Sequence, residues 1–89
     1  MIKIVNYRTP DHLIEAKKAY TFEIDITQSG YTPIGIIHLQ NSRGSVINTN
    51  GYWLDENKTT LSVFNVNTVD TNWTAFMICT ISYIKDEFI

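Results

Sequence analysis

Apolar and polar residues alternate most regularly in the stretch YTFEIDI, residues 20–26. Its apolar side chains occupy every second position, and Thr21, Glu23 and Asp25 lie between them. Because successive side chains of a strand point to opposite faces, this pattern predicts a β-strand with one apolar and one polar face.

The preceding stretch LIEAKKA allows two interpretations. A helix could open at residues 9–11, where threonine suits a cap and proline suits the first helical position. Such a helix would be only about two turns long, and short helices have little stability of their own. We therefore predict a short strand over Leu13–Ala16, followed by a turn at residues 17–18.

A corner of the chain is predicted at Gly30–Pro33. Glycine can adopt a positive φ angle, and proline holds the residue before it in an extended conformation. The apolar residues of the next segment, Ile34–Leu39, do not alternate cleanly, which predicts a strand buried on both faces. Gly35 within this strand indicates the close approach of a neighbouring backbone or ring.

The middle of the chain contains the strongest local hairpin signal, Asn50-Gly51 between the stretches SVIN and YWLD. Asparagine and glycine readily adopt the positive φ angles of a two-residue hairpin turn. We predict a hairpin at this position, a second turn at residues 56–58 and a strand in TTLSVFNV.

The last long apolar stretch, Trp73–Lys85, reads WTAFMICTISYIK. At 3.3 Å per residue a straight strand of this length would extend roughly 43 Å, so we expect it to bend or bulge. Its odd-numbered residues form one apolar face, and Phe76, Ile78 and Ile84 make the other face substantially apolar as well. One sheet face already accounts for the core of so small a domain, so the second face needs cover from another sheet or another subunit.

About six to seven short strands, separated by turns and without a convincing helix, indicate an all-β fold. We predict a single domain over residues 1–89, built as an antiparallel β-sandwich of jelly-roll-like type.

Composition adds a reason to expect self-association. A chain of 89 residues buries roughly two thirds of the surface that its unfolded form exposes, so its stability is marginal without help. The single cysteine, Cys79, allows no internal disulfide and is expected to be a small buried hydrophobe. Oligomerisation is the stabilising aid that remains, so we expect self-association.

Charged residues are only 18% of the chain while Asn and Thr are abundant, which predicts a surface of neutral polar groups.

Charge and hydropathy exclude several partners. The formal net charge is −2 and no basic run is present, so no nucleic acid is expected to bind. The N-terminus is too polar for a secretory signal, and no apolar run approaches the roughly 20 residues that cross a bilayer. We therefore expect no membrane insertion. The sequence contains no phosphate-binding loop or nucleophile elbow, and no cofactor is expected.

Candidate catalytic residues are few. The acidic pairs at residues 55–56 and 86–87 could supply acid and base roles, but solvated turn or terminal charges explain them better. His38 is far in sequence from His12 and lacks a partner at metal-ligand spacing, so we expect a hydrogen-bonded structural or interface residue. We predict no catalytic residue, no metal site and no enzymatic activity.

Aromatic residues are the most suggestive group. Rings at strand ends and turn tips can close the ends of a sandwich, anchor a subunit interface or stack on a sugar ring. Tyr52 and Trp53 are adjacent, so in a regular strand one of them points outward. The candidate ligand-binding aromatics are Tyr52, Trp53 and Trp73, with Asn50 and Asp55 as polar partners.

The stretch YTFEIDITQSGYTPIGIIHLQNSRGS, the Asn/Thr-rich middle and the ending WTAFMICTISYIK together resemble a known class of domains. These are small β domains in structural proteins of phages and prophages of Gram-positive bacteria. There, an alternating strand runs into a Gly-Tyr-x-Pro-Ile turn, and the last strand ends in tyrosine, an aliphatic residue and lysine. The resemblance covers residues 19–85.

This resemblance implies a non-enzymatic virion component of a tail, baseplate, fibre or capsid appendage, made in the bacterial cytoplasm. It implies self-association, often as a trimer, and contact with other virion proteins. From the residues themselves, the expected oligomer interface is the second face of the last strand. Its candidate residues are Phe76, Ile78 and Ile84, with Tyr31 as a further contact.

Two alternatives stay open. The first is a carbohydrate-binding module for host adsorption, which would recognise a cell-wall saccharide through the candidate aromatics. The second is a small enzyme acting on cell-wall polymer, for which only the acidic pairs argue. A tip of a longer fibre and a free-standing accessory component are both compatible with the resemblance.

Overall fold

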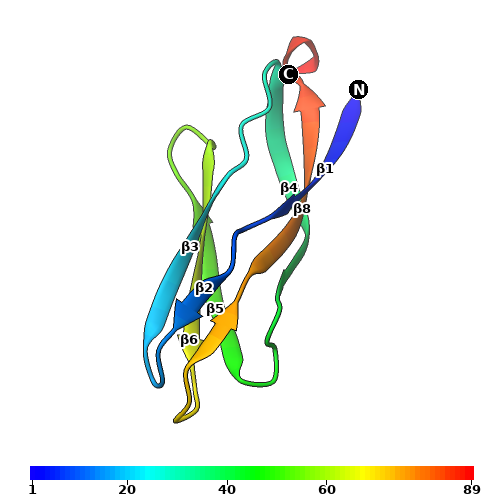
Figure 1. Ribbon diagram of the computed structural model, residues 1–89. Coiled ribbons are helices and arrows are strands. Elements are labelled where there is room, and N and C mark those ends of the chain that lie inside the picture. Colours follow the sequence, from blue (N-terminus) through cyan, green and yellow to red (C-terminus); the bar gives the residue numbers. More distant parts are fainter.

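A computed structural model describes all residues from 1 to 89 and shows an all-β, antiparallel fold (Figure 1). The eight strands are β1 (Ile2–Arg8), β2 (His12–Ile14), β3 (Ala19–Asp25), β4 (Tyr31–Asn41), β5 (Ile47–Leu54), β6 (Thr60–Asn67), β7 (Trp73–Ala75) and β8 (Met77–Lys85). The only helical segment is the 3₁₀ turn η1 (Asp86–Phe88), and no helix is long and apolar enough to cross a membrane.

The strands form two three-stranded sheets that pack in a sandwich-like arrangement. Sheet A has the order β1-β8-β4 and sheet C has the order β3-β6-β5, while β2 and β7 form a short separate ladder. Every pairing is antiparallel. The molecule is elongated, with extents of 50 × 21 × 18 Å. This confirms the predicted all-β class and antiparallel sheets.

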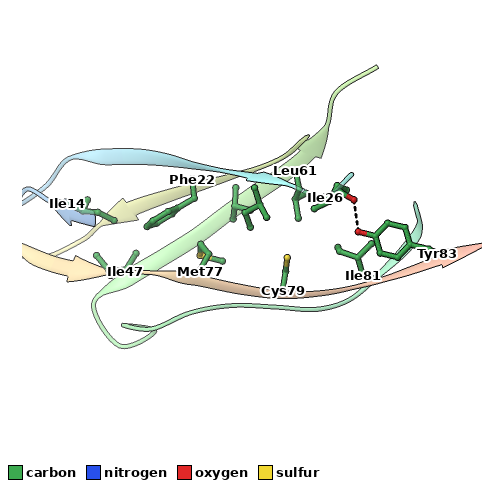
Figure 2. Close-up of a cluster of buried hydrophobic side chains, with 12 residues drawn as sticks. Ile14, Phe22, Ile26, Ile47, Leu61, Met77, Cys79, Ile81 and Tyr83 are labelled. Carbon is green, nitrogen blue, oxygen red and sulfur yellow. Dashed lines mark hydrogen bonds between the residues drawn. The ribbon is translucent and has the colours of Figure 1, made fainter. Parts of the chain in front are cut away.

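The predicted core face of the last stretch is confirmed. Met77, Cys79, Ile81 and Tyr83 of β8 are buried, and the residues between them are only partly covered. Figure 2 shows these side chains lying between the sheets. They meet residues such as Leu61 of β6 in a single cluster of twelve buried hydrophobic residues. Alternation along each central strand therefore places one face of each sheet in a common core.

Cys79 is a buried, free cysteine, as the sequence predicts. Burial raises the pKa of its thiol from 9.0 to about 11, because the core does not solvate a thiolate. At neutral pH the side chain is therefore a protonated, unreactive part of the core.

The last stretch is interrupted at Phe76, which confirms that it does not run as one regular strand. Thr9, in the gap between β1 and β2, lies opposite this break. Its N–H donates to the Met77 carbonyl at 2.9 Å, and its hydroxyl accepts from the Met77 N–H at 2.9 Å. These two bonds satisfy backbone groups that the interrupted ladders leave unpaired.

Some abundant neutral polar residues lie inside instead of on the surface. Asn65 and Asn67 of β6 are fully buried, and Asn41 at the end of β4 is nearly so. The Asn67 amide donates to the carbonyls of Ile14 and Thr71 at 3.0 and 2.9 Å. Buried asparagine is tolerated here because its polar atoms bond to turn and strand backbone.

The hairpin predicted at Asn50-Gly51 is wrong. Strand β5 pairs with β6 from Ile47 to Leu54 without reversing, and only a β-bulge between Thr49 and Gly51 interrupts the register. Gly51 takes a φ of +156°, a value that residues with a side chain rarely adopt. Pairing along the whole of β6 satisfies more backbone groups than a local turn would, so the Asn-Gly signal produces a bulge.

The other boundaries shift by a few residues. The predicted strand at Leu13–Ala16 is β2, His12–Ile14, and no helix forms there. The strand predicted to start at Ile34 starts at Tyr31 and includes Pro33, which an edge strand tolerates. Gly30 makes the preceding turn with a φ of +79°, and the second predicted turn, at residues 56–58, joins β5 to β6.

Candidate functional site

Sheet A presents its second face to solvent, and this face carries the residues expected to form an oligomer interface. Ile84 lies between Ile2 of β1 and Thr32 of β4 in the sheet register. Ile2 and Ile4 are 56% and 60% exposed, and Ile84 is half-buried. We call Ile2, Ile4 and Ile84 the outer isoleucine patch.

The other end of the same face is covered within the chain. The Arg8 guanidinium lies 3.7 Å from the centroid of the Phe76 ring, and Arg8 pairs with Ile78 in the ladder. A cation over an aromatic face is a favourable contact that shields the ring. Phe76 and Ile78 therefore share the face with the outer isoleucine patch, and the Arg8 guanidinium covers part of the Phe76 ring.

The middle of this face is polar. The Thr80 hydroxyl donates to the Asn6 carboxamide oxygen at 2.7 Å, and His38 occupies the position opposite Thr80 on β4. His38 is exposed and its Nε2 lies 3.1 Å from the Gln40 side-chain oxygen. It is hydrogen-bonded, as the sequence predicts, but it lies on the surface, and β4 is not buried on both faces as Ile34–Leu39 is predicted to be.

Tyr31 lies on the opposite side of sheet A from the outer isoleucine patch. Its ring packs against the core cluster, and the Lys3 ammonium lies 4.8 Å from its centroid. In the sheet register Tyr31 pairs with Lys85, which shares the inward orientation of Tyr83. The structure therefore does not bring Tyr31 together with Phe76, Ile78 and Ile84.

A chain of hydrogen bonds runs into the core beside Tyr31. Lys3 Nζ donates to Gln28 Oε1 at 2.8 Å, and Gln28 Nε2 donates to the Tyr7 hydroxyl at 3.0 Å. The Tyr7 and Tyr83 hydroxyls bond to each other, and Tyr83 donates to the Ile26 carbonyl at 2.7 Å. Burial, and then the bond to Tyr7, raise the pKa of Tyr83 far above its ordinary value. The network therefore joins the two sheets through hydrogen-bonded hydroxyl groups.

The candidate ligand-binding aromatics do not form one platform. Tyr52 pairs with buried Val63 and so points to the inner side of sheet C, whereas Trp53 pairs with Ser62 and points outward. Both are exposed, at 55% and 52%. Sequence reasoning expects only one of this pair to be outside. Tyr52 is exposed because β4 does not cover it.

Trp73 is half-buried in β7, where it pairs with Ile14 and packs against the core. The Arg43 guanidinium lies 5.0 Å from its ring centroid. Its indole Nε1 is buried and has no hydrogen-bond partner within the chain. Trp73 is therefore already covered by the protein itself on the side that Arg43 occupies.

Asp55 stabilises the turn between β5 and β6, and its carboxylate is engaged there by hydrogen bonds. Its carboxylate accepts from the Thr59 N–H at 2.7 Å, the Thr59 hydroxyl at 2.7 Å and the Thr60 N–H at 2.8 Å. The bond from the Thr60 backbone, followed by that from the Thr59 side chain, lowers the pKa of Asp55. These contacts use both carboxylate oxygens, so Asp55 is a turn residue and not merely a solvated charge.

The second acidic pair is also engaged. Asp86 accepts from the Thr32 hydroxyl at 2.7 Å, and Glu87 forms an ion pair with Lys85 at 3.2 Å.

His12 stacks on Tyr20 with ring centroids 3.6 Å apart. No group of three His, Cys, Asp or Glu side chains is placed to hold a metal ion.

A hollow that sequence reasoning missed lies between the edge strands β4 and β5. It has a volume of about 660 Å³, and we call it the β4–β5 groove. Its lining residues are Ile26, Thr32, Pro33, Ile34, Gly35, Ile36, Tyr52, Leu54, Lys58, Ile81, Ile84 and Ile89. The sequence prediction missed this groove because the hairpin predicted at Asn50-Gly51 would have divided β5 into two strands. The signal that could have found it is the absence of charge in both strands.

Comparison of the chain with protein-family models, with curated proteins and with solved structures finds no significant match.

Proposed function

We propose that the chain is a non-enzymatic, self-associating structural component of a phage-type virion. In this proposal a closed oligomer, with a trimer favoured, contributes to a tail, baseplate, fibre or capsid appendage and contacts other virion proteins. The resemblance of residues 19–85 supports the virion context. The observation that carries self-association is the 56% and 60% exposure of Ile2 and Ile4 on a sheet whose other face is the core.

A ring-shaped assembly suits this face for a physical reason. Cyclic symmetry covers the same patch in every protomer and leaves no edge for further growth. Burying a half-exposed isoleucine contributes about 1 kcal/mol, so the outer isoleucine patch supplies a few kcal/mol per protomer. The hydrogen-bonded pair of Thr80 and Asn6 beside the patch needs polar partners, which favours one register of association.

Mass spectrometry of density-gradient-purified particles tests the virion context. The particles come from a bacterial strain whose phage or prophage encodes this chain. We expect peptides of the chain in the particle fraction at a fixed ratio to a major tail or capsid protein. Their presence in the cell lysate but not in the particles would contradict the proposal.

A second candidate function is adsorption to a cell-surface saccharide, and the exposed ring of Trp53 favours it. An exposed indole on a sheet surface can stack on a sugar ring without further rearrangement. Titration of purified cell-wall polysaccharide, followed by tryptophan fluorescence, tests this candidate. Binding that is unchanged in Trp53→Ala would remove this residue from the role.

A further inference from the structure

The two sides of the sandwich differ in how their edge strands are protected. On one side the outermost strands are β1 and β3, which carry Lys3, Arg8, Glu23 and Asp25. On the other side they are β4 and β5, and neither contains an Asp, Glu, Lys or Arg residue. Charged side chains on an edge prevent pairing with another chain, so only the second side is open to such pairing.

Residues that belong to the interior are uncovered on this open side. Tyr52 and Leu54 pair with the buried Val63 and Leu61, so their side chains point towards the core layer. Nevertheless they are 55% and 36% exposed. Figure 1 shows β4 and β5 diverging from the turn that joins them, which leaves these positions without an opposing strand.

The β4–β5 groove offers hydrogen bonds as well as apolar surface. Strands β4 and β5 each pair on one side only, so each has one edge of backbone groups without a ladder partner. The register of β4 is broken twice, near Ile34 and near Ile37, whereas β5 is regular from Gly51 to Leu54. An added strand would therefore find regularly spaced donors and acceptors on β5.

We propose that the β4–β5 groove binds an extended segment of a partner protein, which pairs with the free edge of β5. Alternate apolar side chains of the segment enter the groove against Tyr52, Leu54 and Ile81. A volume of about 660 Å³ lies within the usual range of ligand sites. The added strand extends sheet C beside β5, and its inward-facing side chains cover the side chains that β4 leaves exposed.

Charge determines the chemistry of the segment further. Lys58 is the only charged side chain among the residues that line the groove, and the three ion pairs of the chain involve other residues. Lys58 follows β5 in the turn to β6. A carboxylate on the bound segment beside Lys58 therefore completes a pair, so the partner segment alternates apolar residues and carries one acidic residue.

A second copy of this chain fits the groove less well. Two identical hollows present concave surfaces to each other, and pairing of the free β5 edges of two copies would bring no protruding segment into either hollow. Filling the hollow requires a protruding or unpaired extended segment. The inferred site is distinct from self-association, because Ile2 and Ile4 do not line the groove and Ile84 is the one residue that the groove shares with the outer isoleucine patch.

The test titrates the ¹⁵N-labelled full chain with an acetylated peptide of about seven residues in which isoleucine alternates with threonine and one threonine is replaced by aspartate. We expect amide shift changes at Gly51–Leu54 and Lys58, with little change on β1. Leu54→Lys should weaken binding by at least about tenfold, while Leu13→Lys, at an exposed position outside both the groove and the outer isoleucine patch, should leave it unchanged. Tyr52→Ser serves as a milder second variant, and the amide spectrum of each variant verifies its fold.

Two further probes separate strand pairing from general apolar binding. A peptide methylated at the backbone nitrogens that face β5 should lose at least about tenfold in affinity, because it cannot donate to the edge. Lys58→Glu should weaken the aspartate peptide and strengthen a lysine version of it. Equal binding of the methylated peptide, shift changes on β1 or no binding would overturn the proposal. So would a wild-type oligomer that Leu54→Lys alone converts to monomer, because the occupant would then be a second copy.

Discussion

The Tyr83 hydroxyl donates a 2.7 Å hydrogen bond to the backbone carbonyl of Ile26, and this bond joins the two sheets (Figure 2). Tyr83 is in the central strand of sheet A, and Ile26 directly follows β3 of sheet C. This bond is the last one in the hydrogen-bond network that runs from Lys3 through Gln28 and Tyr7 to Tyr83. The two sheets are thus tied by a specific polar contact as well as by apolar packing.

Tyr83→Phe should lower the free energy of unfolding by about 1–2 kcal/mol, because it removes the bonds of this hydroxyl to Tyr7 and to the Ile26 carbonyl, which keeps only the 3.3 Å bond from Tyr7. Chemical denaturation followed by circular dichroism measures the change. Tyr20→Phe is the matched control, since the Tyr20 ring is held by stacking on His12. Equal effects of the two substitutions would show that the sheet-joining bond contributes little.

The fold should lose stability in alkali. The folded-state pKa values of Cys79 and Tyr83 are both raised, so folding is favoured while these groups are protonated in the unfolded chain. Stability should be constant below about pH 9 and fall as the unfolded thiol ionises between its usual pKa of 9.0 and the folded value of about 11.

The slope of this alkaline loss identifies the groups responsible. Each buried group contributes up to about 1.4 kcal/mol per pH unit while it is ionised only in the unfolded state. Cys79→Ala should remove the part of the loss that starts near pH 9 and leave the part due to Tyr83, which starts near its usual pKa of 10.0. Denaturation series at several pH values measure both. An unchanged onset in Cys79→Ala would contradict the assignment.

Acid should loosen the β5–β6 turn. The pKa of Asp55 is lowered in the fold, so its contribution is present above the usual carboxyl pKa of 3.8 and is lost as the pH falls through the lower folded value. Asp55→Ala should already reduce amide protection at Thr59 and Thr60 at neutral pH. Hydrogen exchange measures this protection, and Glu56→Ala is the control in the same turn. Unaltered amide protection in Asp55→Ala would contradict the role of Asp55 in stabilising this turn.

Two glycines should respond in opposite ways to alanine. Gly30 has a φ of +79°, so Gly30→Ala should destabilise the fold by about 1 kcal/mol. Gly44 has no positive φ and open space around it, so Gly44→Ala should be neutral or stabilise by up to about 1 kcal/mol. Thermal unfolding of both variants measures the difference. A destabilised Gly44→Ala beside an unaffected Gly30→Ala would reverse this reasoning.

Periodicity predicted β3 and β8 because it records burial directly. The alternation in residues 20–26 and the odd-numbered face of Trp73–Lys85 both describe strands with one side in the core. The prediction failed at Asn50-Gly51, where the local preference for a turn is weaker than pairing with β6. Long-range pairing of this kind cannot be read from neighbouring residues.

The candidate surfaces were predicted in part. Two apolar faces on the last stretch implied an uncovered outer face, but not that Arg8 from β1 would cover Phe76. The β4–β5 groove depends on how far two sheets diverge, which is a property of the whole sandwich. The only sign of the groove in the sequence is that β4 and β5 contain no charged residue. This is informative only when both are known to be edge strands.

The central claim is that the outer isoleucine patch holds protomers together, and sedimentation velocity at micromolar concentrations tests it most directly. The wild-type chain should sediment as a closed oligomer, with three chains favoured, and Ile4→Lys should sediment as a monomer. Leu13→Lys, at a similarly exposed apolar position on β2, should retain the oligomer. A stable wild-type monomer, or an oligomer that Ile4→Lys does not dissociate, would contradict the account.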